Sequence, residues 1–114
     1  MSLLKESDVK SFEYMDFYRF QEQVMAWAKD RNLIKGSTPK DQFHKLIQEC
    51  AELSDSICKG NDVRDDIGDI LVVLTIISRQ MGVYLDECMY QAWNDIKDRK
   101  GKMVDGIFIK EQDL

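Results

Sequence analysis

The chain has 114 residues, of which 44% are hydrophobic and 32% are charged, which is the composition of one folded domain rather than a disordered chain. The net charge of −5 argues against nonspecific nucleic-acid binding. No apolar run approaches the ~18 residues of a membrane span, and residues 1–10 lack the apolar stretch of a signal peptide. We therefore expect a cytoplasmic protein with no membrane partner, and its three cysteines are expected to be reduced thiols.

The first helix is predicted over residues 15–31, where large apolar side chains recur at helical spacing. These side chains are Phe17, Phe20, Val24, Trp27 and Ala28. The second helix has strong boundary signals. Thr38 is a good N-cap, Pro39 fits the first helical position, and Gly60 closes the helix after about Lys59.

The third helix is predicted to be capped by Asn61 or Asp62 and to run to Met81. The fourth runs from about residue 85 to Lys100, before Gly101. The tail, residues 102–114, is expected to be irregular or partly strand-like, and its apolar segment 107–109 should pack on something. Short loops between the last three helices favour antiparallel neighbours, so the sequence predicts an all-α, four-helix antiparallel bundle.

Acidic residues border the apolar stripe on both central helices. Successive helical residues turn by about 100°. The stripe on the second helix is Phe43, Leu46, Ile47, Cys50, Ser54 and Ile57. The stripe on the third is Val63, Ile67, Ile70, Leu71, Leu74 and Met81. Glu49 and Asp66 fall at the edges of these stripes, and Glu52 and Asp69 lie further round.

Each helix thus carries an acid pair at i, i+3, and the two pairs should meet at similar depth in an antiparallel hairpin. Taken singly, each acid is most simply a solvated surface residue. Asp69 is harder to explain in this way, because apolar side chains follow it on the same face. A shielded carboxylate needs a cation or a donor, and Mg²⁺ prefers oxygen ligands. The pattern therefore predicts that Glu49, Glu52, Asp66 and Asp69 form a cation site.

The segments "KLIQECAEL" and "DDIGDILVVL" resemble the MazG-like nucleotide pyrophosphohydrolases of the all-α NTP pyrophosphatase superfamily. The family signature is EExxE followed by ExxD, and the resemblance spans roughly residues 17–108. Gln48 stands where the first glutamate would be, and Asp66 replaces the glutamate of ExxD. Glu49 and Glu52 match the metal-binding pair of the first motif.

The resemblance implies a single MazG-like domain over residues 1–114, with a helical core of about residues 15–100. It implies hydrolysis of nucleoside triphosphates between the α and β phosphates, giving a monophosphate and pyrophosphate. Mg²⁺, with Mn²⁺ as a possible substitute, would be held by the four acids, and Glu49 or Glu52 would act on the water. Most members are dimers or tetramers, so a homodimer or homotetramer is expected.

Candidate substrate-binding residues lie on the first and fourth helices, and Asn94 among them matches a polar position in the substrate site of the family. Those for phosphate are Asn94, Lys97, Arg99 and Lys100, with Lys102 nearby; those for the base are Trp27 and Trp93, with Phe17 and Tyr90 as further candidates. A simpler interpretation of the lysine and arginine side chains is that they complement the dipole at the C-terminus of a helix. A simpler interpretation of the aromatic side chains is ordinary packing.

Two other functions remain open from the sequence. One is a noncatalytic helical interaction or regulatory module whose acids dock a basic partner. The other is a superfamily relative that acts on dUTP or on a phosphoribosyl nucleotide, for which the acidic motifs would look the same.

Overall fold

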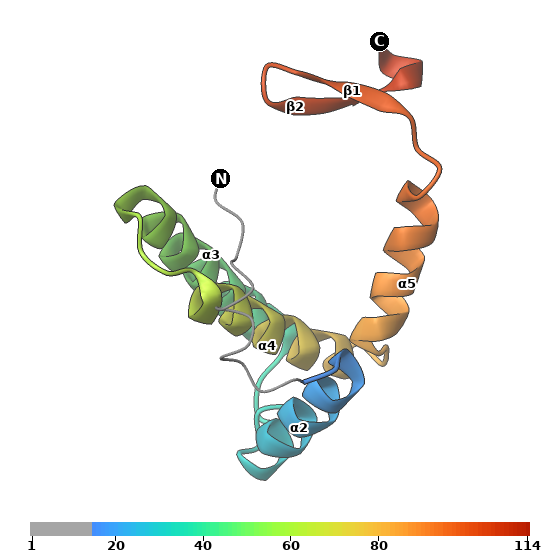
Figure 1. The fold of residues 1–114 in the computed structure, drawn as a ribbon. Coiled ribbons are helices and arrows are strands. Elements are labelled where there is room, and N and C mark those ends of the chain that lie inside the picture. The colour runs from blue at the N-terminus through green and yellow to red at the C-terminus, as the bar shows by residue number, and fades with distance from the viewer. Residues whose placement is uncertain (1–14) are drawn as a thin grey trace.

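The computed structural model describes residues 15–114 as four helices followed by a small β-hairpin (Figure 1). The elements are α2 (Phe17–Asp30), α3 (Pro39–Lys59), α4 (Arg64–Gln80), α5 (Leu85–Ile96), β1 (Gly101–Val104), β2 (Ile107–Lys110) and the 3₁₀ helix η1 (Glu111–Asp113). The predicted all-α class is confirmed. The tail forms an antiparallel hairpin rather than irregular chain, with Gly101 opposite Lys110.

The boundaries of α3 follow from local chemistry. The Thr38 hydroxyl accepts a hydrogen bond from the backbone N–H of Asp41, and the Asp41 carboxylate accepts one from the N–H of Thr38. This capping box satisfies amides that the first turn leaves without partners. At the other end, Gly60 adopts φ 71°, a left-handed conformation that glycine reaches without strain.

Two predicted helix ends are wrong. The N-cap of α4 is Val63, whereas Asp62 accepts a hydrogen bond from the N–H of Arg64 across a short turn. The fourth helix ends at Ile96 rather than Lys100. Beyond Ile96 the chain leads into the hairpin, where the carbonyl of Lys100 accepts a hydrogen bond from the N–H of Glu111.

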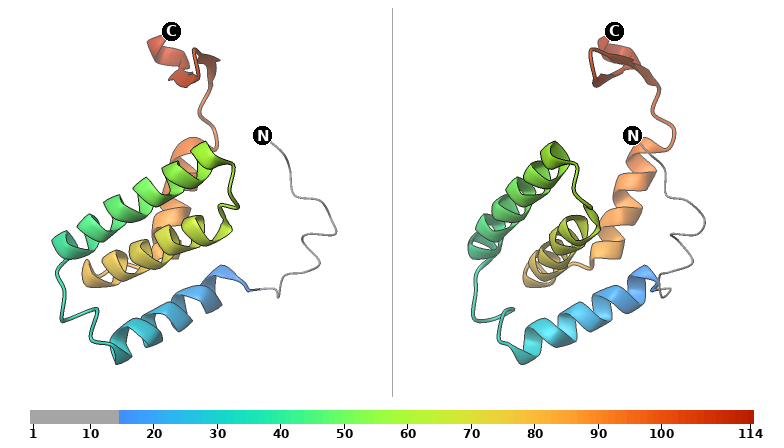
Figure 2. Two further views of the ribbon diagram at one scale, coloured as in Figure 1. Left: turned by 90° about the vertical axis from the view of Figure 1, so that its left-hand side faces the viewer. Right: turned by 60° about the vertical axis from the view of Figure 1, so that its left-hand side comes forward.

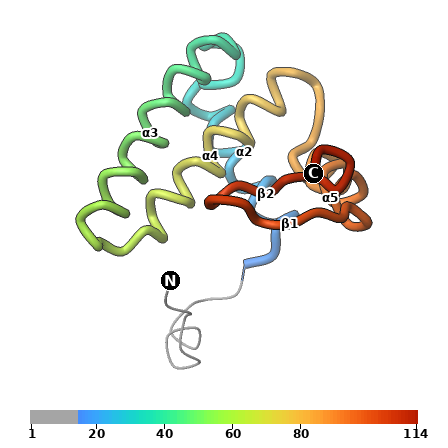
Figure 3. Tube along the Cα trace, turned by 90° about the horizontal axis from the view of Figure 1, so that it is seen from above, coloured from blue at the N-terminus to red at the C-terminus, as the bar shows by residue number. Residues whose placement is uncertain are grey.

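The helices α3 and α4 form an antiparallel pair, and α2 packs across α4 (Figures 2 and 3). The buried apolar side chains among residues 15–114 are Ala28, Val73 and Ile76. The apolar stripe predicted to bury α3 does not do so, because Phe43, Ile47 and Ile57 are more than half exposed. Residues on an adjoining face, including the buried Gln42 and Glu49, turn inward instead.

The last helix leaves the bundle. The axes of α4 and α5 differ by 101°, so the antiparallel arrangement predicted for this pair is wrong (Figure 1). Gly82, at φ 78°, lies in the turn between them. The buried amide oxygen of Gln21, on α2, accepts hydrogen bonds from the N–H groups of Leu85 and Asp86. A side chain distant in sequence therefore fixes where α5 begins.

Replacing Gln21 by leucine should lower the free energy of unfolding by about 1–3 kcal/mol, because it leaves two backbone donors at the start of α5 without their acceptor. Urea denaturation at a fixed protein concentration measures the change. Gln23→Leu makes the same substitution at an exposed position of α2 and should change stability by less than about 0.5 kcal/mol. Equal effects of the two variants would contradict the role assigned to Gln21 at the start of α5.

The hairpin stands apart from the helices. The strands β1 and β2 pack against each other, and β1 also packs against η1. Ile107 is 63% exposed and Phe108 is 46% exposed, so the predicted packing of this apolar segment is not found within residues 15–114. Within the same residues no single helix is long and apolar enough to cross a membrane; α4 and α5 together pass by length and composition, but they are sharply bent.

Candidate metal and nucleotide site

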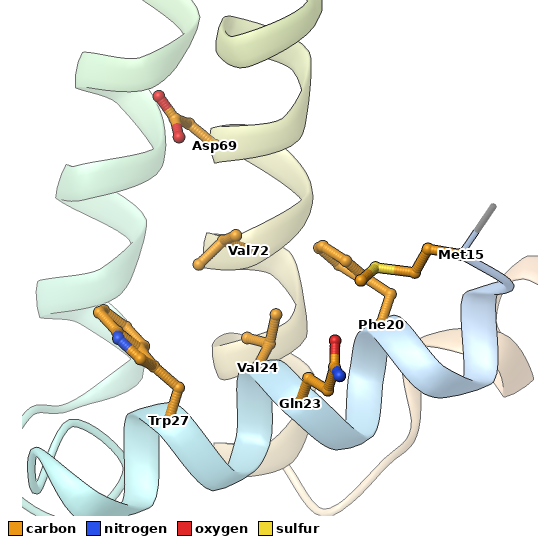
Figure 4. A pocket seen from close by; sticks show the side chains of 7 residues that line it. All are labelled: Met15, Phe20, Gln23, Val24, Trp27, Asp69 and Val72. Atoms are coloured by element: carbon orange, nitrogen blue, oxygen red, sulfur yellow. The ribbon is translucent and has the colours of Figure 1, made fainter. Parts of the chain in front are cut away.

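Three of the four predicted metal ligands converge between α3 and α4. Carboxylate oxygens of Glu49, Glu52 and Asp69 lie within 4.8 Å of one another. The i, i+3 spacing places both glutamates on one side of α3. Asp69 projects from α4 toward α3 (Figure 4). We call these three residues the acid cluster.

Glu49 is the most enclosed member of the acid cluster, at 5% exposure. Its Oε1 accepts a salt bridge from Lys45, one turn earlier, at 3.0 Å. Its Oε2 is buried and has no hydrogen-bond partner among the described residues. Burying a carboxylate oxygen without a partner costs free energy, and a cation or a hydrogen-bond donor beside this atom would remove that cost.

The acids of the cluster disfavour one another's ionisation. The negative charge of Glu49 raises the pKa of Glu52. Burial is the largest cause of the raised pKa of Asp69, and the charges of Asp65, Glu49 and Asp66 add to it. A divalent cation among these oxygens would reverse each effect, because an opposite charge favours the ionised form.

Asp66, the fourth predicted ligand, is half-buried on α4 and lies outside the group of converging oxygens. Its charge still raises the pKa values of Glu52 and Asp69. Its side chain is one methylene shorter than the glutamate of the family motif. Asp66 is therefore placed to support the site electrostatically, with less reach than a glutamate at the same position.

Lys45, a half-exposed side chain, forms a salt bridge with the buried Glu49, a contact that the sequence analysis does not predict. The Glu49 carboxylate raises the pKa of Lys45, so the ammonium form is favoured. The available signal was the i, i+4 spacing of Lys45 and Glu49, which is common on solvated helix faces and therefore not specific.

A pocket of about 440 Å³ adjoins the acid cluster (Figure 4). Its walls are largely apolar and come mainly from α2 and α4; the lining residues are Met15, Phe20, Gln23, Val24, Trp27, Asp69 and Val72. Trp27, one of the candidate base-contacting residues, therefore lies in the same pocket as Asp69, and Phe17 lies beside Phe20 with ring centroids 6.1 Å apart. Asp69 lines the pocket and is also a member of the acid cluster, so the apolar pocket lies directly beside the carboxylates.

The remaining predicted substrate residues lie on α5 and just beyond it. Asn94 is half-buried, whereas Trp93 and Tyr90 are 60% and 71% exposed. Lys97, Arg99, Lys100 and Lys102 follow in the connection to the hairpin and in β1. Because α5 diverges from α3 and α4, the chain by itself does not bring these side chains to the acid cluster (Figure 1).

The site's geometry agrees with the comparisons with known proteins. Residues 37–104, which include Glu49, Glu52, Asp66 and Asp69, match the MazG nucleotide pyrophosphohydrolase domain. The match covers more than half of the chain, and the protein belongs to this family.

One curated relative is an uncharacterized 18.2 kDa protein in the rep-hol intergenic region of Haemophilus phage HP1 (strain HP1c1). It is 39% identical over 67 residues, which are 57% of this chain and 41% of that protein. The aligned part thus spans about two-fifths of the phage protein. No solved structure matches the chain with statistical significance.

Proposed function

We propose that this protein is a Mg²⁺-dependent nucleoside triphosphate pyrophosphohydrolase. It cleaves an NTP or dNTP between the α and β phosphates and releases a monophosphate and pyrophosphate. The observation that carries the proposal is the acid cluster, whose buried Glu49 oxygen has no partner among the described residues and which opens beside an apolar pocket in a MazG domain.

The oxygen-only donor set fits a hard divalent cation, Mg²⁺ or in its place Mn²⁺. Glu49, Glu52 and Asp69 would hold it, with Asp66 as a further ligand or a nearby countercharge. When bound, the ion neutralises phosphate charge and lowers the pKa of a coordinated water. Lys45 orients the Glu49 carboxylate through its salt bridge.

The proton of the attacking water needs an acceptor within the acid cluster. Glu49 is buried and already shares one oxygen with Lys45, whereas Glu52 is exposed. A general base must lie within reach of the water that it deprotonates, and solvent reaches Glu52 more readily than Glu49. We therefore assign proton acceptance to Glu52, in addition to its contribution to the cation site, and cation binding alone to Glu49.

The apolar pocket receives the base or sugar, with Trp27 as its aromatic wall. Asn94, Lys97, Arg99 and Lys100 bind the phosphates, and Trp93 accompanies them on α5. Because these residues lie on a helix that diverges from the acid cluster, we propose that a homodimer or homotetramer forms with the site near a subunit interface. The physiological role proposed for this cytoplasmic enzyme is removal of surplus or noncanonical nucleotides.

A panel of NTPs and dNTPs, assayed with Mg²⁺, tests the reaction. We expect equimolar monophosphate and pyrophosphate, no orthophosphate, and loss of turnover when the ion is chelated. Release of orthophosphate alone, or turnover that chelation does not affect, would contradict the mechanism. Turnover of dUTP or of a phosphoribosyl nucleotide alone would identify a specialised relative. Lack of turnover of any nucleotide would favour a noncatalytic module.

A further inference from the structure

The protein has a second pocket, on the side of α2 opposite the pocket that adjoins the acid cluster. Its volume is about 620 Å³, which is within the range of small-molecule sites. Met25 lines this second pocket, whereas Trp27 lines the first. Residues two apart on a helix lie about 160° apart around its axis, so α2 stands between the two pockets.

Positive side chains predominate in the second pocket. It is lined by the C-terminal half of α2, the loop that follows α2, and the last turn of α4. Its charged lining residues are Lys29, Lys35, Arg79 and Glu22, and we call it the basic pocket. The chain as a whole has a net charge of −5, so the sign of the charge is reversed at this place. A hollow lined mainly by one sign of charge attracts ligands of the opposite sign, here anions.

The three cations of the basic pocket are not neutralised by the protein. Within residues 15–114, no carboxylate pairs with Lys29, Lys35 or Arg79. The guanidinium carbon of Arg79 lies 5.7 Å from the centre of the Tyr84 ring, a contact that restricts this side chain but supplies no negative charge. Like charges that share a pocket repel one another, and a bound anion would relieve that repulsion.

Helix dipoles do not account for all three cations. Lys29 and Arg79 lie in the last turns of α2 and α4, where a positive side chain complements the dipole. Their own carbonyls already accept hydrogen bonds from the N–H groups of Asn32 and Gly82. Lys35 lies in the loop after α2 and belongs to no helix end. A negatively charged ligand would account for all three side chains together.

The loop that forms one wall of the basic pocket is held by α4. The side-chain amide of Gln80 donates hydrogen bonds to the carbonyls of Ile34 and Ser37, at 3.2 and 2.9 Å. The Ser37 hydroxyl donates in turn to the carbonyl of Leu33. Figure 2 shows this loop passing beside the C-terminal end of α4. The wall is therefore formed before a ligand binds, which lowers the entropic cost of binding.

The other lining residues indicate what the anion carries besides its charge. Met25, Ala26 and Ile34 are apolar, and Asn32 offers an amide that both donates and accepts hydrogen bonds. An inorganic phosphate ion would leave the apolar residues uncovered, whereas a nucleoside group would cover them. The basic pocket is also larger than the pocket of about 440 Å³ to which we assign the base or sugar of the substrate.

We infer that the basic pocket is a second nucleotide site, which binds its ligand without a divalent cation. Lys29, Lys35 and Arg79 bind the phosphate oxygens, and the apolar residues cover the nucleoside. None of these residues belongs to the acid cluster or to the proposed substrate site. Failure of the inference therefore leaves the proposed reaction intact, and an inactive protein that binds a nucleotide here would leave the inference intact.

Binding in the absence of metal distinguishes the basic pocket from the acid cluster. With a chelator present, the carboxylates of the acid cluster repel phosphate, so no attraction remains there. We expect ADP, GDP, CDP or UDP, titrated separately into the chelated protein, to shift the amide NMR signals of residues 22–35 and Arg79 in a saturable way. The signals of Glu49, Glu52 and Asp69 should stay in place. Shifts that do not saturate with any of these nucleotides, or that are confined to the acid cluster, would overturn the site.

Two fragments of the nucleotide test which part of it is recognised. Inorganic pyrophosphate carries the charge alone, and the free nucleoside carries the apolar part alone. Each should bind at least about 10-fold more weakly than the nucleoside diphosphate, because each loses one set of contacts. Pyrophosphate that binds as tightly as the diphosphate would overturn the assignment of an organic ligand. A nucleoside that binds as tightly would overturn the role of the cations.

A matched pair of charge variants tests the residues. Lys35→Gln removes one cation of the basic pocket without changing a helix end, and it should weaken binding of the diphosphate about 10-fold. Lys40→Gln makes the same change at an exposed position of α3 that does not line the pocket, and it should change the affinity by less than about twofold. Equal effects of the two variants would indicate nonspecific attraction to positive charge and would overturn the site.

Discussion

Replacing Asp69 by asparagine should reduce pyrophosphate release by about 100-fold or more, because the change removes a negative ligand from the acid cluster and weakens the stabilisation of phosphate charge. Glu52→Gln should have an effect of the same order. Steady-state rates at saturating nucleotide and Mg²⁺ measure it. The shape of the side chain is nearly preserved in both variants, so the loss reports on charge.

The same variants should fold at least as well as the wild type when no metal is present. Burial and neighbouring acids raise the pKa of Asp69, so its ionised form is unfavourable in the metal-free protein. Thermal melts with chelator should therefore give an equal or higher Tm for Asp69→Asn. A fall in both activity and metal-free stability would indicate a structural role for Asp69 and would contradict the site.

Asp55→Asn is the matched control. Asp55 lies on the same helix as Glu52, but its carboxylate pairs with Lys59 at 2.8 Å and both side chains are largely exposed. Such a surface pair contributes no more than about 1 kcal/mol. Asp55→Asn should keep wild-type turnover. If it is inactive while Asp69→Asn turns over normally, the assignment of the converging carboxylates is wrong.

Mg²⁺ should raise the Tm of the wild-type protein by about 10 °C at a concentration 100 times the Kd, since the ion binds only the folded state. This increase in Tm caused by Mg²⁺ should become larger as the pH rises. The pKa values of Glu52 and Asp69 are raised above their ordinary values of 4.5 and 3.8, so the folded state holds more protons than the unfolded state just above those values. The metal-free protein therefore loses stability as pH rises through this window.

Mg²⁺ requires the ionised carboxylates and offsets this loss, so the difference between melts with and without Mg²⁺ should be larger near pH 7.5 than near pH 5. Asp69→Asn should reduce both the Mg²⁺ effect and its pH dependence. Equal Mg²⁺ shifts at the two pH values, in wild type and variant alike, would show that the ion binds elsewhere.

The sequence predicted what local chemistry determines. The ends of α3 follow from Thr38, Pro39 and Gly60, each of which acts within one turn of the helix. The convergence of Glu49 and Glu52 with Asp69 follows from helical spacing and a short loop between two antiparallel helices. These features depend on few residues that lie close together along the chain.

Features that depend on distant contacts could not be predicted. The direction of α5 is determined by hydrogen bonds from Leu85 and Asp86 to Gln21, which no local pattern indicates. On α3, the apolar arc is wider than one packing partner needs. Hydrophobicity alone does not determine which part of this arc faces α4. The sequence therefore places Phe43 in the buried stripe of α3, whereas its side chain is 54% exposed.

The most direct measurement of the proposed site is anomalous diffraction from crystals grown with Mn²⁺. The account predicts a metal peak about 2 Å from carboxylate oxygens of Glu49, Glu52 and Asp69, with the buried Oε2 of Glu49 among its ligands. The peak should be absent from Asp69→Asn crystals and present in Asp55→Asn crystals. A wild-type structure with Mn²⁺ bound only elsewhere, or with the acid cluster free of metal at saturating Mn²⁺, would contradict the central claim.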